Sequence, residues 1–106
     1  MIFFLRNVVL TERQIVMIIA VDIGNTNIVV GCIKGEEICF VERMSTESTR
    51  TELEYAISFK NVLEMYGISI EQLDGGIISS VVPKITKTAK LAVEKILDKE
   101  VLVVGA

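Results

Sequence analysis

Histidine is absent from the 106-residue sequence, and cysteine occurs only twice, at Cys32 and Cys39. Two cysteines separated by six residues, with no histidine, do not match the ligand spacing of zinc sites. A disulfide is the alternative, but no secretion signal places the chain in an oxidising compartment. We therefore expect two buried, reduced thiols.

Proline is scarce as well. One proline and seven glycines, with 51% hydrophobic residues, are not the composition of a disordered segment. A chain of this length buries roughly 65% of its unfolded surface, which is enough for one core but not for two. The composition therefore predicts a single domain.

Positive charge is neither in excess nor clustered. The sequence has 11 basic and 14 acidic residues, for a formal net charge of −3. Nucleic-acid-binding domains carry a basic patch, so no nucleic acid is expected as a partner. Small molecules or proteins are the expected partners.

Long apolar runs are missing too. The run Ile2 to Leu5 is interrupted by Arg6 and Asn7, and the run from Ile15 ends at Asp22. Neither provides the ~20 apolar residues of a membrane span, nor the apolar region and cleavage site of a secretory signal. The sequence therefore predicts a cytoplasmic protein with no membrane partner.

The most informative stretch is Met17 to Gly31, in which two apolar runs flank an acidic residue and a tight polar turn. Ile18 to Val21 is predicted to be a buried strand and Ile28 to Ile33 its antiparallel partner. Asp22 then stands where the first strand ends.

The turn itself has the residues of a phosphate cradle. Gly24 can adopt a positive φ and has no Cβ, so the amides of Gly24, Asn25, Thr26 and Asn27 could face one concavity and bind a phosphate oxygen. Asn25 and Thr26 add side-chain donors. The plain alternative is an Asx-type turn in which Asp22 bonds to its own backbone.

A second hairpin follows directly. Gly35 and Glu36 fit a two-residue type II′ turn, because glycine comes first. This register predicts Cys32 opposite Cys39 and Gly31 opposite Phe40.

A helix is predicted after the polar segment Met44 to Arg50. Its start fits a capping box of Thr51 with Glu54 or of Thr49 with Glu52, and Gly67 closes its end. The expected apolar stripe consists of Leu53, Ala56, Ile57, Val62, Leu63 and Tyr66.

The turn signal Asp74-Gly75-Gly76 precedes a predicted strand over residues 77–82, which Pro83 stops. Pro83 also suits the first turn of a second helix, where Ile85, Ala89, Ala92, Val93 and Ile96 recur at helical spacing. Val101 to Val104 reads as a strand buried on both faces.

The predicted elements follow the order β-β-β-α-β-α-β. This order matches an α/β ribonuclease H-like domain, with a mixed five-stranded sheet of three antiparallel strands extended by two parallel ones.

Four motifs in this order resemble a known family. The turn D-I-G-N-T-N at Asp22 to Asn27 resembles the first phosphate motif of sugar kinases, actin and heat-shock chaperone ATPases, in the form carried by type III pantothenate kinases. The helix start R-T-x-x-E, the strand S-S-V-V-P and the end V-L-V-V-G also match, so the resemblance covers Met17 to Gly105. It departs at Ala106, where the family has proline.

The resemblance implies ATP-dependent phosphorylation of pantothenate to 4′-phosphopantothenate, the first step of coenzyme A biosynthesis. The implied ATP-binding residues are Asp22, Ile23, Gly24, Asn25, Thr26, Asn27, Ile28 and Val29, and Asp22 would hold Mg²⁺ through water. Ser79 and Ser80 would line the nucleotide cleft, although small hydroxyls there also suit close packing of strand and helix. Arg50 stands at the R-T element, where a solvated arginine is the plain alternative.

The resemblance covers only the first half of the family's fold. It implies a second domain that carries the general base and a monovalent-cation site for K⁺ or NH₄⁺, so no catalytic residue is expected in this chain. Residues 17–106 would form the N-terminal nucleotide-binding domain of a homodimer, and residues 1–16 an upstream extension before a start at Met17. An edge strand at Phe3 to Leu10 is the competing interpretation of that extension.

Two other functions remain open at this point. One is a non-catalytic nucleotide-binding module of the same superfamily with a regulatory or assembly role. The other is a dinucleotide-binding domain, against which the absence of G-x-G-x-x-G after the first strand argues.

Overall fold

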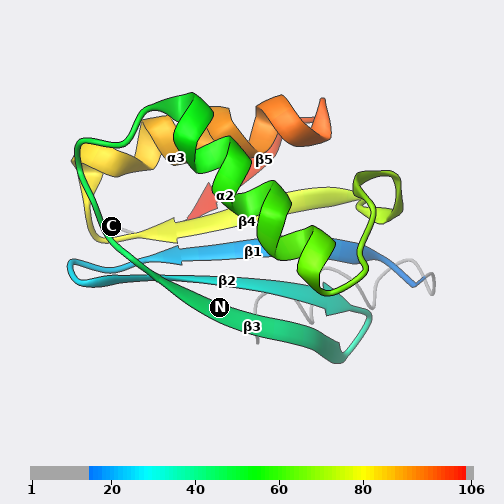
Figure 1. The fold of residues 1–106 in the computed structure, drawn as a ribbon. Helices are drawn as coiled ribbons and strands as arrows, with labels where there is room; N and C mark the ends of the chain where they lie inside the picture. Colours follow the sequence, from blue (N-terminus) through cyan, green and yellow to red (C-terminus); the bar gives the residue numbers. More distant parts are fainter. Residues whose placement is uncertain (1–14, 105–106) are drawn as a thin grey trace.

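The computed structural model describes residues 15–104 and shows a five-stranded sheet with two helices packed on one face (Figure 1). The elements in chain order are β1 (Met17–Ile23), β2 (Asn27–Lys34), β3 (Glu37–Ser45), α2 (Glu52–Met65), the 3₁₀ turn η1 (Ile70–Gln72), β4 (Gly75–Ser80), α3 (Pro83–Leu97) and β5 (Val101–Val104). The strand order across the sheet is β3-β2-β1-β4-β5. The predicted mixed sheet and its order along the chain are confirmed.

β1 is the central strand, antiparallel to β2 on one side and parallel to β4 on the other. Its apolar residues are buried on both faces of the sheet, because other apolar side chains pack against each face. Ile19, Val21 and Ile23 face α2 and α3, whereas Ile18 and Ala20 face the other side. Asp22 is the exposed residue in this otherwise buried strand.

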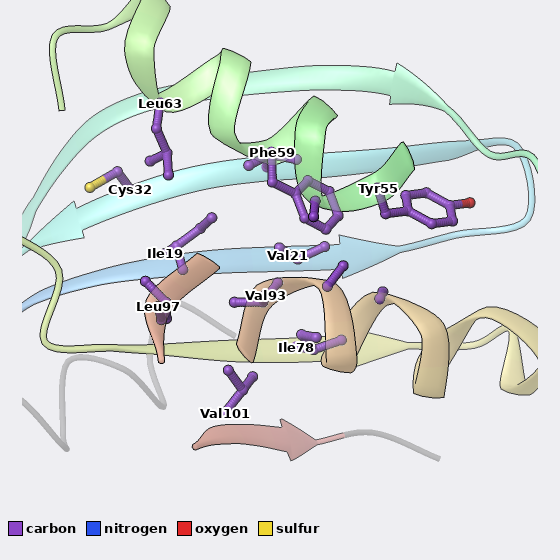
Figure 2. Close-up of a cluster of buried hydrophobic side chains, with 14 of the residues drawn as sticks. Ile19, Val21, Cys32, Tyr55, Phe59, Leu63, Ile78, Val93, Leu97 and Val101 are labelled. Atoms are coloured by element: carbon purple, nitrogen blue, oxygen red, sulfur yellow. The ribbon is translucent and has the colours of Figure 1, made fainter. Parts of the chain in front are cut away.

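The main core lies between the sheet and the two helices. Figure 2 shows Tyr55, Phe59 and Leu63 reaching down from α2 toward β1 and β2, with Val93 and Leu97 contributed by α3. The helix α3 comes especially close to β4 at Gly76, where an added Cβ would stand 3.1 Å from Ile19 Cγ2 and 3.2 Å from Val93 Cγ1. A glycine in this strand therefore permits the close approach.

The stripe predicted for α2 is rotated from the observed one. Tyr55, Ala56, Phe59 and Leu63 are buried, while Leu53 is 59% exposed and Ile57 is 50% exposed. The two aromatic rings decide the orientation, because they bury more apolar surface than the aliphatic residues they displace. The predicted end at Gly67 is confirmed by its φ of +70°, and Ile68 N–H closes a Schellman motif on the Leu63 carbonyl.

The second hairpin has the predicted turn but a different register. Gly35 has a φ of +62°, and Lys34 pairs with Glu37 around it. A bulge then shifts the pairing, so that Cys32 lies opposite Phe40 and Gly31 opposite Val41. The predicted pairs Cys32 with Cys39 and Gly31 with Phe40 are therefore wrong.

The burial of Phe40 explains the bulge. In a regular ladder Phe40 would share the face of Gly31, away from the helices. The extra residue moves its ring to the core face, where it stacks on Tyr66 with centroids 4.4 Å apart. The bulge leaves Cys39 exposed. The prediction of two buried thiols therefore holds only for Cys32. Both cysteines are free, with no disulfide between them.

The C-terminal part differs from the prediction in two details. β4 begins at Gly75 and ends at Ser80, so the two glycines belong to the strand and residues 81 and 82 do not. β5 is an edge strand with Leu102 50% exposed and Val103 39% exposed, so the prediction of burial on both faces is wrong beyond Val101. On α3, the predicted Ile85, Ala89, Ala92 and Val93 are buried, and Ile96 is partly buried.

Two expectations concern the chain ends. The edge strand predicted at Phe3 to Leu10 lies outside the described residues. Of the predicted extension, residues 1–16, only residues 15 and 16 are described. Val16, at that end, already belongs to the sheet region, because its carbonyl accepts a hydrogen bond from Gly35 N–H at 3.0 Å. Within residues 15–104, no helix has the length and apolar character needed to cross a membrane.

Candidate functional site

Asp22 is exposed one residue before the end of β1. Its side chain points to the sheet face opposite α2 and α3, since its neighbours Val21 and Ile23 both face those helices. In the ladder it lies between Val29 of β2 and Ser79 of β4. A carboxylate is thus presented at the end of the central strand.

The turn that follows is held by its own backbone. Gly24 N–H donates to the Asn27 carbonyl at 2.9 Å. A Cβ on Gly24 would stand 3.1 Å from the same carbonyl oxygen, so a larger residue would crowd this contact and glycine is favoured. Gly24 is not among the glycines with positive φ, so the left-handed conformation expected from the sequence is not used.

Two amides of the turn remain available as donors. Among the described residues, neither Asn25 N–H nor Thr26 N–H donates to any acceptor, and both residues are exposed. The turn therefore offers fewer free amides than the four predicted, because the Gly24 amide already donates to the Asn27 carbonyl. Asn25 and Thr26 supply the free backbone donors, together with their side chains.

A contact from the next loop fixes this turn. Thr46 N–H donates to the Thr26 carbonyl at 2.9 Å, and Thr46 Oγ1 donates to the Gly24 carbonyl at 2.8 Å. Thr46 is a site residue that the sequence analysis missed. Its place beside the turn depends on the pairing of β2 with β3, which the polar segment Met44 to Arg50 does not reveal.

The remaining predicted nucleotide residues differ in what they can offer. Ile23 and Ile28 are at most 1% exposed and face the core, so they can contribute only backbone atoms. Val29 is half-buried beside Asp22. These three residues position the turn, whereas Asp22, Asn25 and Thr26 present polar groups.

The two serines of β4 have separate roles. Ser79 is half-buried and shares a face with Asp22 in the parallel ladder, so it stays a candidate for lining the cleft. Ser80 is 5% exposed, and its hydroxyl accepts from Val82 N–H at 3.0 Å and from Thr86 Oγ1 at 2.8 Å. Its contacts support close packing at the start of α3.

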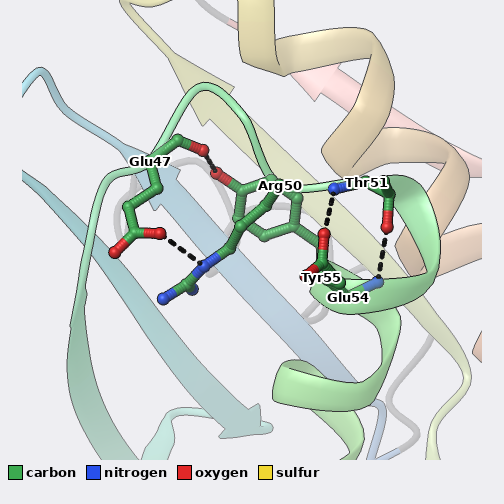
Figure 3. Close-up of polar contacts among 5 residues, drawn as sticks. All are labelled: Glu47, Arg50, Thr51, Glu54 and Tyr55. Carbon is green, nitrogen blue, oxygen red and sulfur yellow. Dashed lines mark hydrogen bonds and ion pairs between the residues drawn. The ribbon is translucent and has the colours of Figure 1, made fainter.

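Arg50 lies at the start of α2, next to the N-cap. The capping box is the first of the two predicted pairs: Glu54 N–H donates to Thr51 Oγ1 at 3.2 Å, and Thr51 N–H donates to Glu54 Oε1 at 2.8 Å (Figure 3). This hydrogen bond from Thr51 lowers the pKa of the Glu54 carboxyl below its ordinary value. Arg50 is half-buried beside it, so it is not a fully solvated arginine.

The donor set fits a hydrated magnesium ion. No group of three or more His, Cys, Asp or Glu side chains converges anywhere in residues 15–104. Mg²⁺ keeps several waters and takes one or two carboxylates plus substrate phosphates. One exposed carboxylate, followed in the chain by two free amides that can hold phosphate oxygens, matches that mode. It does not match a site built from protein ligands alone.

The sequence matches a known family over most of its length. The family model described as type III pantothenate kinase matches residues 18–106. A type III pantothenate kinase of Bifidobacterium longum is 40% identical over 89 residues, covering 84% of this chain and 35% of the relative. The enzyme of Brevibacillus brevis is 38% identical over the same length and coverage. The chain thus spans about a third of the length of these relatives.

Solved structures agree on the fold. A ROK hexokinase from Thermus thermophilus aligns with a TM-score of 0.63 at 13% identity, covering 84% of this chain and 33% of that one. A Bacteroides thetaiotaomicron protein described as having an actin-like ATPase fold and unknown function aligns with a TM-score of 0.61 at 7% identity, covering 97% of this chain and 37% of that one. With an actin-like ATPase fold and a family match that begins in β1 and includes the Asp22 turn, the chain belongs to the type III pantothenate kinase family.

Proposed function

We propose that residues 17–106 form the N-terminal nucleotide-binding domain of an enzyme that transfers a phosphoryl group from ATP to pantothenate, giving 4′-phosphopantothenate. The observation that carries the proposal is the exposed Asp22 at the end of β1, followed by the free amides of Asn25 and Thr26. Phosphoryl transfer depends mainly on positioning and on neutralising charge, and these groups supply both.

Each polar group has a separate part in the proposal. Asn25 and Thr26 donate hydrogen bonds to phosphate oxygens of ATP, which fixes the nucleotide against the end of the sheet. Asp22 holds Mg²⁺ through water, and the ion, when bound, screens the negative charge of the phosphates. Thr46 keeps the turn in place while these contacts form.

The proposal assigns the general base to a second domain. Asp22 is assigned to the metal and the sequence has no histidine, so no residue of this chain is proposed to deprotonate the pantothenate hydroxyl. A monovalent-cation site for K⁺ or NH₄⁺, a homodimer and a cytoplasmic location belong to the same proposal and rest on the family match.

A chimera tests the activity directly. Residues 18–104 replace the matching segment of the Bifidobacterium longum relative, and release of ADP and 4′-phosphopantothenate is measured. The proposal expects turnover that needs both ATP and pantothenate, and its loss in an Asp22→Asn chimera of equal thermal stability. A folded chimera that binds Mg·ATP without transferring the phosphoryl group would favour the non-catalytic nucleotide-binding module instead.

A further inference from the structure

The Arg50 side chain is held on two sides but keeps one donor unused. Its Nε lies 3.4 Å from Glu47 Oε2, and its guanidinium carbon lies 5.8 Å from the centroid of the Tyr55 ring (Figure 3). The distance to the ring is within the range of a cation–π contact. The side chain is 24% exposed, so the guanidinium is largely fixed against the protein.

The unused donor is Nη1. It is buried, and no acceptor among the described residues accepts a hydrogen bond from it. Buried side-chain donors nearly always have a partner, so an unpaired one in a charged group calls for an explanation. An oxygen of a bound ligand or of an ordered water can supply the missing acceptor.

The neighbouring carboxylates are engaged elsewhere. Glu47 pairs with Nε, and Glu54 accepts from Thr51 N–H. The Coulombic effect of Arg50 on the pKa of Glu54 is smaller than the effect of that hydrogen bond. Neither carboxylate accepts a hydrogen bond from Nη1.

The loop that carries Arg50 is attached to the candidate phosphate turn. Thr46, four residues earlier, bonds to the carbonyls of Gly24 and Thr26. At the other end, Tyr55 Oη donates to the Glu47 carbonyl at 2.6 Å. The loop is therefore anchored both to the turn and to α2, and Arg50 lies in the chain between these two anchors.

We propose that Arg50 Nη1 binds an oxyanion of the reactants, either a phosphoryl oxygen of ATP or the carboxylate of the acceptor. This inference rests on the proposed function and adds a second binding group to the same site. A guanidinium suits the role because its planar fork pairs with two oxygens of a phosphate or carboxylate.

Binding of separate probes by the 106-residue chain tests the inference. Amide and arginine side-chain NMR signals are followed during titration with inorganic pyrophosphate and, separately, with pantothenate. Arg50→Met removes the fork and keeps an apolar stem over Tyr55, whereas Arg50→Lys keeps the charge alone. Lys60→Met, on an exposed position of α2, is the control for loss of one positive charge.

The expected result is binding that weakens roughly tenfold in Arg50→Met, with partial recovery in Arg50→Lys and no change in Lys60→Met, as for loss of a charge-assisted hydrogen bond. A loss confined to pyrophosphate identifies the phosphoryl group as the partner, and a loss confined to pantothenate identifies the carboxylate. Thermal midpoints measured on the same samples show whether each variant is folded.

Two outcomes would overturn the inference, and they are distinguishable. If both probes bind the folded Arg50→Met or Arg50→Lys variant as well as they bind the unsubstituted chain, the guanidinium has a structural role only and the proposed function is untouched. If the unsubstituted chain binds neither probe nor Mg·ATP, the proposed function fails and this inference fails with it.

Discussion

Thr46 and Gly24 are joined by a hydrogen bond of 2.8 Å from the threonine hydroxyl to the glycine carbonyl. The bond ties the loop after β3 to the turn after β1, across 22 residues of sequence. Because the Thr46 amide also bonds to Thr26, the turn is held by two contacts from one residue. The free amides of Asn25 and Thr26 are presented by a turn that is already fixed.

Replacement of Thr46 by valine should loosen this turn. Thr46→Val preserves the shape of the side chain and removes the bond to Gly24, so we expect a loss of about 1 kcal/mol in the free energy of unfolding. Urea unfolding measures the loss. Thr49→Val, in the exposed part of the same loop, is the matched control and should unfold as the unsubstituted chain does. Equal stability of the two variants would contradict a role for the Thr46 hydroxyl.

The close contact of α3 with β4 predicts opposite behaviour for two neighbouring glycines. A Cβ at Gly76 would meet side chains of Ile19, Val93 and Leu97 at 3.1 to 3.4 Å, whereas a Cβ at Gly75 would meet nothing within 4 Å. Gly76→Ala should therefore destabilise the fold by about 1 to 3 kcal/mol through overpacking. Gly75→Ala should leave stability unchanged or raise it by up to about 1 kcal/mol. The thermal midpoints of the two variants measure this difference. Similar midpoints would show that α3 does not pack tightly on Gly76.

The elements of the fold could be predicted because their signals are local. Short apolar runs bounded by turn residues located the strands, and the two candidate capping pairs and Gly67 located the ends of α2. The features that were missed depend on residues far apart in sequence. The bulge at Cys39 follows from stacking of Phe40 on Tyr66, and the rotation of α2 follows from the fit of Tyr55 and Phe59 to the sheet.

The same distinction applies to the candidate site. Asp22 and the turn from Gly24 to Asn27 form a contiguous motif and could be found in the sequence. Ser79 and Ser80 could not be told apart, because only the ladder and the start of α3 show which hydroxyl is already engaged. Thr46 had no signal of its own.

The two cysteines should react at very different rates. Burial, followed by the proximity of Cys39 and hydrogen bonding with it, raises the pKa of Cys32 to about 12, so almost no thiolate forms there at pH 8. Cys39 is exposed. A thiol reagent at pH 8 should modify Cys39 quickly and Cys32 only on unfolding, and Cys39→Ser should remove the fast phase.

Protein prepared without oxidant should show two free thiols in denaturant. Fewer than two, with a reducible link seen by mass spectrometry, would contradict the reduced state of both cysteines. It would also weaken the expectation of a cytoplasmic location.

The capping box should give α2 a pH-dependent component of stability. The Thr51 amide holds the pKa of Glu54 below its ordinary value of 4.5 in the folded state. A lowered carboxyl pKa stabilises the fold above pH 4.5, and the contribution is lost as the pH falls through the folded-state pKa. The free energy of unfolding of Glu54→Gln should therefore differ from that of the unsubstituted chain at pH 7, and this difference should shrink below pH 4.5. A difference that does not change with pH would contradict this assignment.

The N-cap residue offers a second test of the same helix. Thr51→Ala removes the acceptor for Glu54 N–H and should lower the free energy of unfolding by about 1 kcal/mol at neutral pH. If Thr49 with Glu52 were the capping pair instead, Thr51→Ala would leave the free energy of unfolding unchanged and Thr49→Ala would lower it. Urea unfolding of Thr51→Ala beside Thr49→Ala compares the two.

The central claim is that the end of β1 binds the phosphates and magnesium of ATP, and titration of the isotope-labelled chain with Mg·ATP tests it most directly. We predict that the amide signals of Asn25 and Thr26 shift, and that Asp22→Asn weakens the binding roughly tenfold or more, as for loss of a charged contact. Glu71→Gln, an exposed carboxylate in η1 at the other end of the sheet, should bind as the unsubstituted chain does. Unchanged signals at Asn25 and Thr26, or equal affinity in a folded Asp22→Asn chain with magnesium present, would contradict the account.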